Sequence, residues 1–432
     1  MVNRQTNICI LGAGPAGAAA ALKLSRLGIP CVLIDKASFP RDKICGDGIS
    51  HRVMDIMGKW IDSSVVERFV ASKNIHLDSW GLIFEGTKSN RLDIEYRPYK
   101  DKTLETPSGF ACKRWEFDNF LVNEVRACAN IEFIENLEMT DFQPNTVTPE
   151  RDDDGSVKGG MQGDEGWILK NKKGDFILKT RLLLVADGAH SRFARHIGGI
   201  EMDAKHYMAS VKSYYKGITG FHADNYLEFY FLKDFLPGYF WIFPLANGEA
   251  NVGIAIVSEE VSKRKLNLKK CLQEVIDSKF KDRFKDAQLV SEIQGFGLPL
   301  GSKKRKLSGE SYMLLGDAAS LIDPLMGEGI ANAILSGAVA AEQAAKCLER
   351  NDFSAKILRG YDERIYRMRW TEFKVSYWLQ RQFRRAWFFN SLAFLVSKNK
   401  QLARAAAYVF VDTNLKKKIF KPSFWYKLIF NN

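Results

Sequence analysis

Alternating apolar and polar stretches at the start of the chain predict a strand, a glycine-rich turn, a helix and a second strand. Residues 7–11 form a short apolar run, and residues 15–27 are rich in alanine at helical spacing. Gly28 predicts the end of that helix, and residues 31–34 predict another buried strand, which ends at Asp35. Residues 38–50 contain turn-forming residues without periodicity and predict a loop.

The next elements follow from residues 114–188. Residues 114–129 predict a helix, because apolar side chains recur there at helical spacing. Residues 140–166 are rich in Pro, Gly and Asp and predict an exposed loop or insertion. Residues 167–170 and 176–179 flank Asn-Lys-Lys-Gly-Asp, which predicts a hairpin, and residues 182–186 predict a buried strand.

The pattern changes after residue 205. Alternating aromatic segments at 207–216, 226–231, 239–243 and 250–257 predict a mainly antiparallel sheet, with one helix near 266–284. Residues 312–315 predict a short buried strand and residues 330–348 a long alanine-rich helix. From residue 351 onward the pattern is helical and aromatic.

Composition narrows the class of protein. The chain has 432 residues, 46% of them hydrophobic and 26% charged, which is typical of a folded globular protein of two or three domains. No apolar run approaches the ~18 residues that span a bilayer, and the N-terminus lacks a signal-peptide cleavage pattern. The seven cysteines form no CxxC pair and the six histidines no HxxxH or HxH pair. We therefore expect a reducing cytoplasm and no metal site.

Net charge is concentrated at the C-terminal end. The whole chain carries +12, and residues 361–432 alone carry +11, together with 18 of the 52 aromatic residues. Basic faces with Trp and Phe suit an anionic membrane surface, so we expect peripheral attachment through 361–432, on the inner face of the membrane. The alternative is a helical cap that buries its aromatics and solvates its lysines. Without a recognisable binding module, we expect no nucleic acid partner.

The first turn carries a nucleotide-binding motif. Gly12-Ala13-Gly14-Pro15-Ala16-Gly17 is a GxGxxG sequence between a strand and a helix. Its glycines permit a tight turn, a close approach to a pyrophosphate and close packing of helix on strand. Asp35, followed by Lys36, ends the second strand, where a carboxylate holds ribose hydroxyls. An acid at this position favours the ADP-ribose of FAD or NAD over a 2′-phosphate.

Later segments resemble the flavoprotein family typified by p-hydroxybenzoate hydroxylase. The matching segments are Arg114 with Phe117-Asp118, the Asp-Gly motif at Asp187-Gly188, the Gly-Asp motif at Gly316-Asp317, and the segment Asp323-Pro324-Leu325-Met326-Gly327-Glu328-Gly329-Ile330. The resemblance implies FAD bound by these residues. It also implies an α/β fold: a Rossmann-like FAD-binding domain of the p-hydroxybenzoate hydroxylase and glutathione reductase type, an inserted mainly antiparallel sheet domain and a C-terminal helical region.

The residues allow other interpretations of two of these motifs. Asp317 could be a helix cap and Asp187 a plain turn residue. Gly327 and Gly329, however, allow backbone to lie against a flat ring, and a helix that starts near Ile330 would aim its N-terminus at that ring. The chain has no second GxGxxG, so we expect NAD(P)H or a ferredoxin-type donor to act only as a transient reductant.

Two further segments are similar to geranylgeranyl reductases within that family. Lys43-Ile44-Cys45-Gly46-Asp47 looks like their Lys-x-x-Cys-Gly loop beside the flavin. Tyr239-Phe240-Trp241-Ile242-Phe243-Pro244 matches their Tyr-x-Trp-x-Phe-Pro motif, which lines the lipid cavity, although Ala255 replaces the second glycine of a following Gly-x-Gly. The resemblance implies substrate contacts at Gly46, Tyr239, Trp241, Phe243 and Pro244.

Cys45, Tyr239 and Trp241 are the candidate catalytic residues. A thiol or phenol there would donate a proton to carbon. The alternatives are that Cys45 is a small buried hydrophobe and that both aromatics are core residues.

We therefore expect an FAD-dependent oxidoreductase that reduces C=C bonds of a prenyl or other lipid-like substrate. The alternatives are an FAD-dependent monooxygenase or halogenase acting on an aromatic or polyketide substrate, and a non-catalytic prenyl-lipid binding protein. The expected FAD-binding domain comprises 1–75, 107–200 and 301–350, the substrate domain 76–106 and 201–300, and the helical region 351–432. The oligomeric state stays open.

Overall fold

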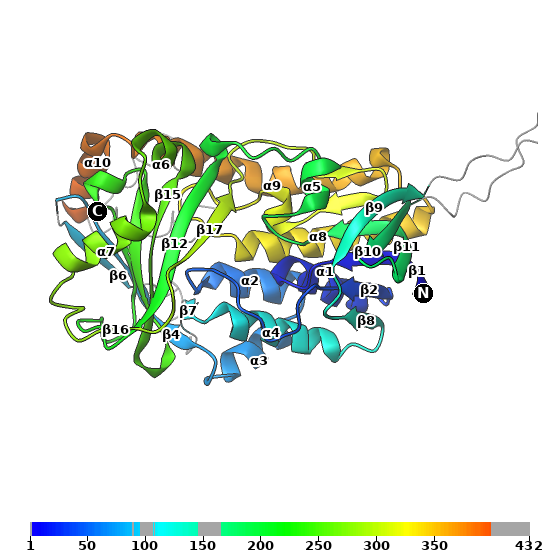
Figure 1. The fold of residues 1–432 in the computed structure, drawn as a ribbon, viewed down its shortest axis with the longest axis horizontal. Helices are drawn as coiled ribbons and strands as arrows, with labels where there is room; N and C mark the ends of the chain where they lie inside the picture. The colour runs from blue at the N-terminus through cyan, green and yellow to red at the C-terminus, as the bar shows by residue number, and fades with distance from the viewer. Residues whose placement is uncertain (1, 89, 96–106, 108, 146–165, 399–432) are drawn as a thin grey trace, which may run out of the picture.

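A computed structural model describes residues 2–88, 90–95, 107, 109–145 and 166–398, and its two large sheets lie at opposite ends of an elongated molecule (Figure 1). The first sheet runs in the order β18-β19-β11-β1-β2-β8, with β10 and β9 attached to β11. Its strands are β1 (Val2–Leu11), β2 (Cys31–Ile34), β8 (Ile131–Ile134), β9 (Met139–Asn145), β10 (Gly166–Asn171), β11 (Phe176–Val185), β18 (Ser308–Gly309) and β19 (Tyr312–Leu314). Parallel pairing of β1 with β2 and β11 confirms the predicted Rossmann-like unit.

Two helices pack closely beside this sheet. Helix α1 (Pro15–Arg26) ends where Gly28 adopts φ +72°, as expected for a glycine that terminates a helix. Helix α8 (Ile330–Arg350) packs on α1 so closely that a Cβ on Gly337 would lie 2.1 Å from the Ala16 carbonyl oxygen. Small side chains therefore set this distance between the helices. The predicted helix at 114–129 is α4 (Arg114–Arg126).

The second sheet runs in the order β16-β12-β15-β14-β13-β5-β6, with β17 also paired to β12. Its strands are β5 (Gly81–Glu85), β6 (Arg91–Glu95), β12 (Tyr207–Lys216), β13 (Leu227–Tyr230), β14 (Gly238–Pro244), β15 (Glu249–Val257), β16 (Gln288–Leu289) and β17 (Gln294–Pro299). All pairs are antiparallel except β13 with β5, which confirms the predicted mainly antiparallel sheet.

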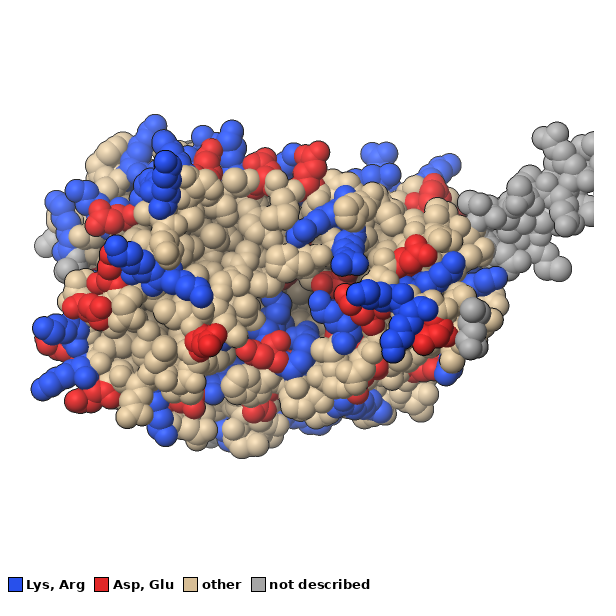
Figure 2. All heavy atoms as spheres, in the orientation of Figure 1, with Lys and Arg blue, Asp and Glu red and all other residues tan. Residues whose placement is uncertain are grey.

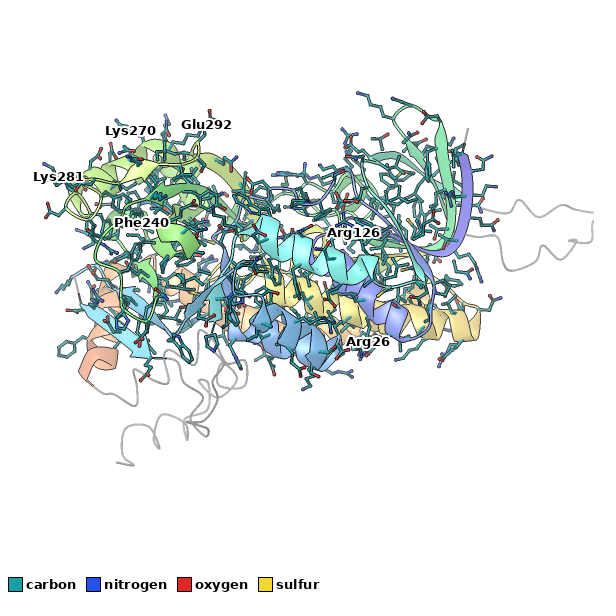
Figure 3. All side chains as sticks on the ribbon, turned by 90° about the horizontal axis from the view of Figure 1, so that it is seen from below. Arg26, Arg126, Phe240, Lys270, Lys281 and Glu292 are labelled. Atoms are coloured by element: carbon teal, nitrogen blue, oxygen red, sulfur yellow. The ribbon has the colours of Figure 1, made fainter. Side chains whose placement is uncertain are left out.

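The two faces of this sheet have different roles. Phe240 of β14 is fully buried and stacks on Phe280 beyond α7 (Leu268–Ser278), at a centroid distance of 5.0 Å. Figure 3 shows Phe240 in the interior of this unit, with Lys270 and Lys281 at its surface. Since neighbouring side chains of a strand point to opposite faces, Tyr239 and Trp241 face the other way, toward the first sheet.

Elements between residues 48 and 111 connect the two sheets. A small sheet, β3-β7-β4, contains β3 (Gly48–Ser50), β7 (Gly109–Ala111) and β4 (Leu77–Ser79). Helices α2 (His51–Trp60) and α3 (Ser63–Ala71) follow β3, and the sequence pattern did not predict them. The remaining short helices are α5 (Arg192–His196) and α6 (Ser258–Arg264).

The C-terminal helices extend along the molecule and confirm the helical prediction as far as residue 398. Helix α9 (Ala355–Gln382) packs on α8 and then reaches the second sheet, where α10 (Ala386–Lys398) follows. Phe373, Phe383 and Phe389 are buried, as the cap interpretation expects, whereas Trp378 and Trp387 are exposed. Residues 399–432 of the proposed membrane segment lie outside the described residues.

Several predicted bounds are wrong. Residues 140–145 belong to strand β9 and not to the expected loop, of which 146–165 lie outside the described residues. The two strands expected at 176–179 and 182–186 are one strand, β11, because its pairing with β1 continues through Thr180. The helix expected at 266–284 begins at Leu268 and ends at Ser278. The domain bounds stay a prediction.

Candidate active site

A cavity of about 670 Å³ lies between the two large sheets. Figure 2 shows this face of the molecule hollowed near its middle, with lysine and arginine side chains around the hollow. Residues predicted from the motifs line the cavity: Gly12, Gly14, Pro15, Ala16, Asp35, Lys36, Cys45, Gly46, Arg114, Asp187, Gly188, Tyr239, Trp241, Phe243, Asp317, Gly327, Gly329 and Ile330. The fold therefore brings segments from both sheets to one site.

The three glycines of the first motif have distinct steric roles. Gly12 has φ +100°, and a Cβ there would lie 2.5 Å from the Ala186 carbonyl oxygen. A Cβ on Gly17 would overlap the Gly12 carbonyl oxygen at 1.8 Å. A Cβ on Gly14 would meet only Arg41, at 3.6 Å, and Gly14 lines the cavity. Gly12 and Gly17 are thus required by the fold itself, whereas Gly14 leaves room for a ligand.

Asp35 is fixed by the backbone around this turn. Its carboxylate accepts hydrogen bonds from the Ala13 N–H at 2.7 Å and the Ala37 N–H at 2.9 Å. The side chain is buried but lines the cavity. Each oxygen keeps a lone pair, so the carboxylate is placed to accept hydrogen bonds from ribose hydroxyls.

Two helix N-termini meet at the cavity. Helix α1 begins after Gly14 and α8 begins after Gly329, and neither N-cap residue has a side chain that bonds to the first turn. Their free N–H groups and partial positive charges favour an anion. Asp317 lies beside Gly329, where a Cβ would be 3.4 Å from its Oδ1. Asp317 caps neither α8 nor the short 3₁₀ helix Gly316–Ala319, so the cap interpretation is wrong.

The guanidinium of Arg114 is paired with the carboxylate of Asp118. The guanidinium donates two hydrogen bonds of 2.8 Å to Asp118, which also pairs with Arg41 at 3.1 Å. Burial acts to lower the pKa of Arg114, but the charges of Asp118 and of neighbouring Cys45 raise it overall. The two guanidinium groups share one buried carboxylate, which leaves a positive charge beside the cavity.

The side chain of Asp187 has one oxygen that accepts no hydrogen bond from the described residues. This oxygen, Oδ1, is buried. Burial raises the pKa of this carboxyl to about 6, although Ser191 and Lys36 act to lower it. A buried acceptor of this kind fits a ligand hydroxyl or N–H better than it fits a plain turn residue.

A buried carboxylate fixes the loop that carries Cys45. Asp47, with φ +64°, accepts hydrogen bonds from the Tyr214 hydroxyl at 2.7 Å and from the Asn251 amide at 2.8 Å. Asn251 also donates to the Cys45 carbonyl oxygen at 2.8 Å. Burial raises the pKa of Asp47 to about 6, with the Tyr214 and Asn251 hydrogen bonds opposing. The loop is therefore tied to the second sheet.

The second sheet supplies an apolar wall. Tyr239, Trp241 and Phe243 alternate along β14, and Gly46 lies against the last two. The Tyr239 hydroxyl donates to the Met326 carbonyl oxygen, and the Trp241 Nε1–H donates to Asn251 at 2.8 Å. Burial raises the pKa of Tyr239 above its ordinary value, and the charge of Asp323 adds to this. Because their polar atoms are engaged, both side chains present ring surface to the cavity.

Four predicted residues do not line the cavity. Gly17 and Gly316 lie where backbone and helices pack, and Pro244 is the last residue of β14. Pro324 is turned to α9, where its carbonyl oxygen accepts a hydrogen bond from Gln380. The sequence reasoning gave no site role to Asp47, Lys212, Tyr214, Asn251 or Phe296. A polar residue inside a mostly apolar strand, such as Asn251, is the signal that could have found them.

These observations fit FAD. Gly14 leaves space at an uncapped helix N-terminus, Asp35 can hold a ribose, and Asp187 has an unsatisfied oxygen facing the same cavity. Among the described residues, no three His, Cys, Asp or Glu side chains gather to hold a metal ion. No helix within the described part of the chain is long and apolar enough to cross a membrane.

Comparison with known families agrees with this site. Residues 5–370 match the family described as FAD binding domain, so the chain belongs to this family of flavoproteins. The chain is an FAD-dependent oxidoreductase, as the motifs predicted.

Curated relatives are similar to this chain over most of its length. A menaquinone reductase of Mycobacterium tuberculosis (strain ATCC 25618 / H37Rv) is 28% identical over 352 residues, covering 79% of this chain and 77% of the relative. A digeranylgeranylglycerophospholipid reductase of Methanosarcina acetivorans is 28% identical over 373 residues, covering 85% and 80%. The predicted resemblance to geranylgeranyl reductases is thereby confirmed.

Solved structures share the fold. A geranylgeranyl bacteriochlorophyll reductase-like protein from Thermoplasma acidophilum superposes with a TM-score of 0.77 at 20% identity, covering 99% of this chain and 98% of the other. A flavin-dependent brominase superposes with a TM-score of 0.71 at 18% identity, covering 98% and 96%. The same architecture therefore supports more than one chemistry, and the site must decide between them.

Proposed function

We propose that the protein reduces carbon–carbon double bonds of a prenyl lipid-like substrate. The observation that carries this proposal is the apolar wall of Tyr239, Trp241 and Phe243, which lines one cavity together with the Cys45 loop packed against it. A prenyl chain offers only apolar surface along its length, so such a wall matches it. Relatives named for digeranylgeranylglycerophospholipid and menaquinone reduction support this substrate class.

The chain's own residues would hold FAD and exclude water. The turn at Gly12–Gly17 and Asp35 would hold its nucleotide half, and Asp317 its ribityl chain. Gly327, Gly329 and the start of α8 would lie against its ring. When bound and reduced by an external donor, FAD would supply the hydride. The aromatic wall keeps the double bond in a dry site, where alignment of the reacting atoms contributes most of the acceleration.

Cys45 is the proton donor we favour. Tyr239 donates its hydroxyl proton to Met326 and has a raised pKa, and Trp241 donates to Asn251, so neither has a proton free for the substrate. Cys45 lines the cavity and lies beside the Arg114 guanidinium, whose positive charge would stabilise the thiolate that remains. Proton transfer from the thiol to carbon completes the addition of hydrogen.

Positive side chains around the cavity bear on the electron donor, and the substrate bears on where the protein acts. His190, Arg192 and Lys43 line the cavity and would attract an anionic donor, either NAD(P)H or a ferredoxin-type protein. A prenyl lipid resides in a membrane, so we propose peripheral attachment of the C-terminal region to an anionic membrane surface, on its cytoplasmic side.

An oxygen-free turnover experiment tests the proposed function. The bound flavin is reduced under nitrogen, geranylgeraniol is added, and product mass and flavin reoxidation are followed. We expect a gain of two mass units per reduced bond, and a rate at least about tenfold lower for Cys45→Ser with unchanged flavin content. Cys128→Ser, which changes a partly buried thiol outside the cavity lining, is the control.

Two outcomes would contradict the proposal. Turnover that requires oxygen and adds sixteen mass units would favour the monooxygenase alternative. Binding of the lipid without any turnover, under either gas, would favour a non-catalytic lipid-binding protein.

A further inference from the structure

A buried lysine lies beside the apolar wall. Lys212 of β12 is 2% exposed and lines the cavity, and its Nζ has no acceptor among the described residues. The ammonium rests on the face of the Tyr214 ring, 3.6 Å from the ring centroid. Burial lowers the pKa of Lys212, while the charge of Asp47 opposes that shift. A buried cation with three unused donors is costly unless a partner arrives.

The register of the sheet places Lys212 next to the prenyl wall. Gly253 of β15 pairs with Trp241 on one side and with Lys212 on the other. A Cβ on Gly253 would lie 2.2 Å from the Trp241 ring, so this ring lies across Gly253 toward β12. The indole and the ammonium therefore occupy one row of the sheet, on its cavity side.

The carboxylates of Asp47 and Asp42 act electrostatically on Lys212, and neither forms a hydrogen bond with its Nζ. The Asp47 carboxylate accepts from Tyr214, Asn251 and the Arg114 N–H, and it forms no ion pair with Lys212. Since these donors hold Asp47 in place, its carboxylate cannot turn toward Lys212 without breaking hydrogen bonds. Within the described part of the chain the Nζ of Lys212 has no acceptor, so a bound ligand can supply one.

A second lysine lies on the same side of the cavity. Lys43 places its Nζ 3.2 Å from the centroid of the Phe296 ring, and Phe296 pairs in register with Ser210, two residues from Lys212. Lys43, Ser210, Lys212 and Phe296 all line the cavity. The sheet surface is thus apolar along β14 and cationic along β12.

We propose that Lys212 marks a head-group subsite that binds an oxyanion, a phosphate or diphosphate, at the polar end of the prenyl substrate. This inference rests on the proposed function and names the end of the substrate that the function leaves open. The chain of the lipid lies along the β14 side, and its oxyanion accepts hydrogen bonds from the Lys212 ammonium, with Lys43 adding positive charge. The ligand thereby satisfies donors that the protein leaves unused.

Paired lipids that differ only at the head group test this subsite. Binding of geranylgeranyl diphosphate and of geranylgeraniol to the FAD-loaded protein is measured by calorimetry. We expect the diphosphate to bind at least about tenfold more tightly. Lys212→Met should weaken diphosphate binding about tenfold to a hundredfold and change alcohol binding little, since a charged hydrogen bond is lost. Lys212→Arg should keep most of the preference.

Controls separate this inference from the proposed function. Lys216→Met changes an exposed lysine at the end of the same strand and should leave both affinities unchanged. Equal loss for both lipids in Lys212→Met, or an unchanged preference, would overturn the subsite. So would a change only in the flavin midpoint potential, because the acceptor would then be the flavin. Binding of neither lipid to the wild-type protein would contradict the proposed function itself.

Discussion

Asp47 shows how one residue organises the site. It is fully buried, adopts a left-handed backbone conformation, and ties the Cys45 loop to Tyr214 and Asn251 of the second sheet. The hydrogen bonds of Asp47 compensate the cost of burying its charge only in part, which leaves its pKa raised to about 6. The same residue therefore fixes the loop and makes stability depend on pH.

We predict that Asp47 lowers stability as pH rises from about 4 to about 6. The folded state binds the Asp47 proton more tightly than the unfolded state, so the free energy of unfolding falls across this window. The fall amounts to roughly 3 kcal/mol for a shift of this size. Chemical denaturation at several pH values should show this fall in the wild type and its absence in Asp47→Asn. If the free energy of unfolding depends on pH in the same way in both proteins, Asp47 is not the group responsible. Asp187 is present in both proteins, so its contribution cancels in the difference.

At the scale of elements, the turn before α1 contains some glycines that the fold needs and one that leaves space for a ligand. Gly12 and Gly17 are needed because backbone atoms occupy the space of a Cβ, whereas Gly14 has φ −70° and faces the cavity. Gly12 and Gly17 thus serve the fold, whereas Gly14 serves ligand binding.

We predict that Gly14→Ala folds normally but binds FAD at least about tenfold more weakly. The added methyl has room in the protein and occupies the approach of the pyrophosphate, so the free energy of unfolding without FAD should change by less than about 0.5 kcal/mol. Gly12→Ala is the matched variant and should lose about 1–3 kcal/mol, because φ +100° strains alanine. Wild-type FAD affinity in Gly14→Ala would show that the pyrophosphate lies elsewhere.

Helix α9 supports the loop behind the predicted ring site. Ser376 donates a 2.7 Å hydrogen bond to Asp323, whose other oxygen accepts the N–H groups of Leu325 and Met326. Gln380 donates to the Pro324 carbonyl oxygen. The helix therefore holds the backbone that leads into Gly327 and Gly329.

We predict that Ser376→Ala lowers the free energy of unfolding by about 1–3 kcal/mol and weakens FAD retention. The variant removes a buried donor to a carboxylate, which is costly. Ser354→Ala, at the start of the same helix where the side chain makes no cap, should change stability by less than about 0.5 kcal/mol. Thermal melts and flavin content after gel filtration measure both effects; equal behaviour of the two variants would contradict a supporting role.

At the scale of the whole molecule, the C-terminal helices end in exposed aromatics beside basic residues. Trp387 is 64% exposed and Phe394 55%, close to Arg381 and Arg385 on the same stretch of chain. Among exposed large hydrophobic residues, Trp378 belongs to the same region. A surface of this composition suits the interface of an anionic bilayer.

We predict that Trp387→Ala reduces binding to vesicles of phosphatidylglycerol and phosphatidylcholine about threefold or more, and that salt weakens binding of the wild type. Screening acts on exposed charges beyond ~8 Å at physiological ionic strength. Met202→Ala removes an exposed apolar side chain elsewhere and should leave vesicle sedimentation unchanged. Equal binding to neutral vesicles, or equal loss in both variants, would count against this surface.

The sequence by itself determined features that rest on neighbouring residues. The turn at Gly12–Gly17, the strand that ends at Asp35 and the alternation of Tyr239, Trp241 and Phe243 follow from local spacing, because backbone conformation and strand periodicity are short-range properties. These features predicted a nucleotide-binding turn and an antiparallel sheet, whereas the prediction of FAD rested on the resemblance of later segments to a flavoprotein family. They did not predict α2 and α3, whose packing depends on elements far along the chain.

Only the tertiary structure decided which polar residues meet. Asp47 and Asn251 are 204 positions apart, and Lys212 lies in one row with Trp241 only because Gly253 pairs with both residues. Such contacts depend on the register between distant strands, which no local pattern specifies. Likewise, the sequence left open whether Tyr239 and Trp241 are chemical groups or apolar lining. Their hydrogen bonds to Met326 and Asn251 favour the wall that we propose, since these buried donors are already engaged.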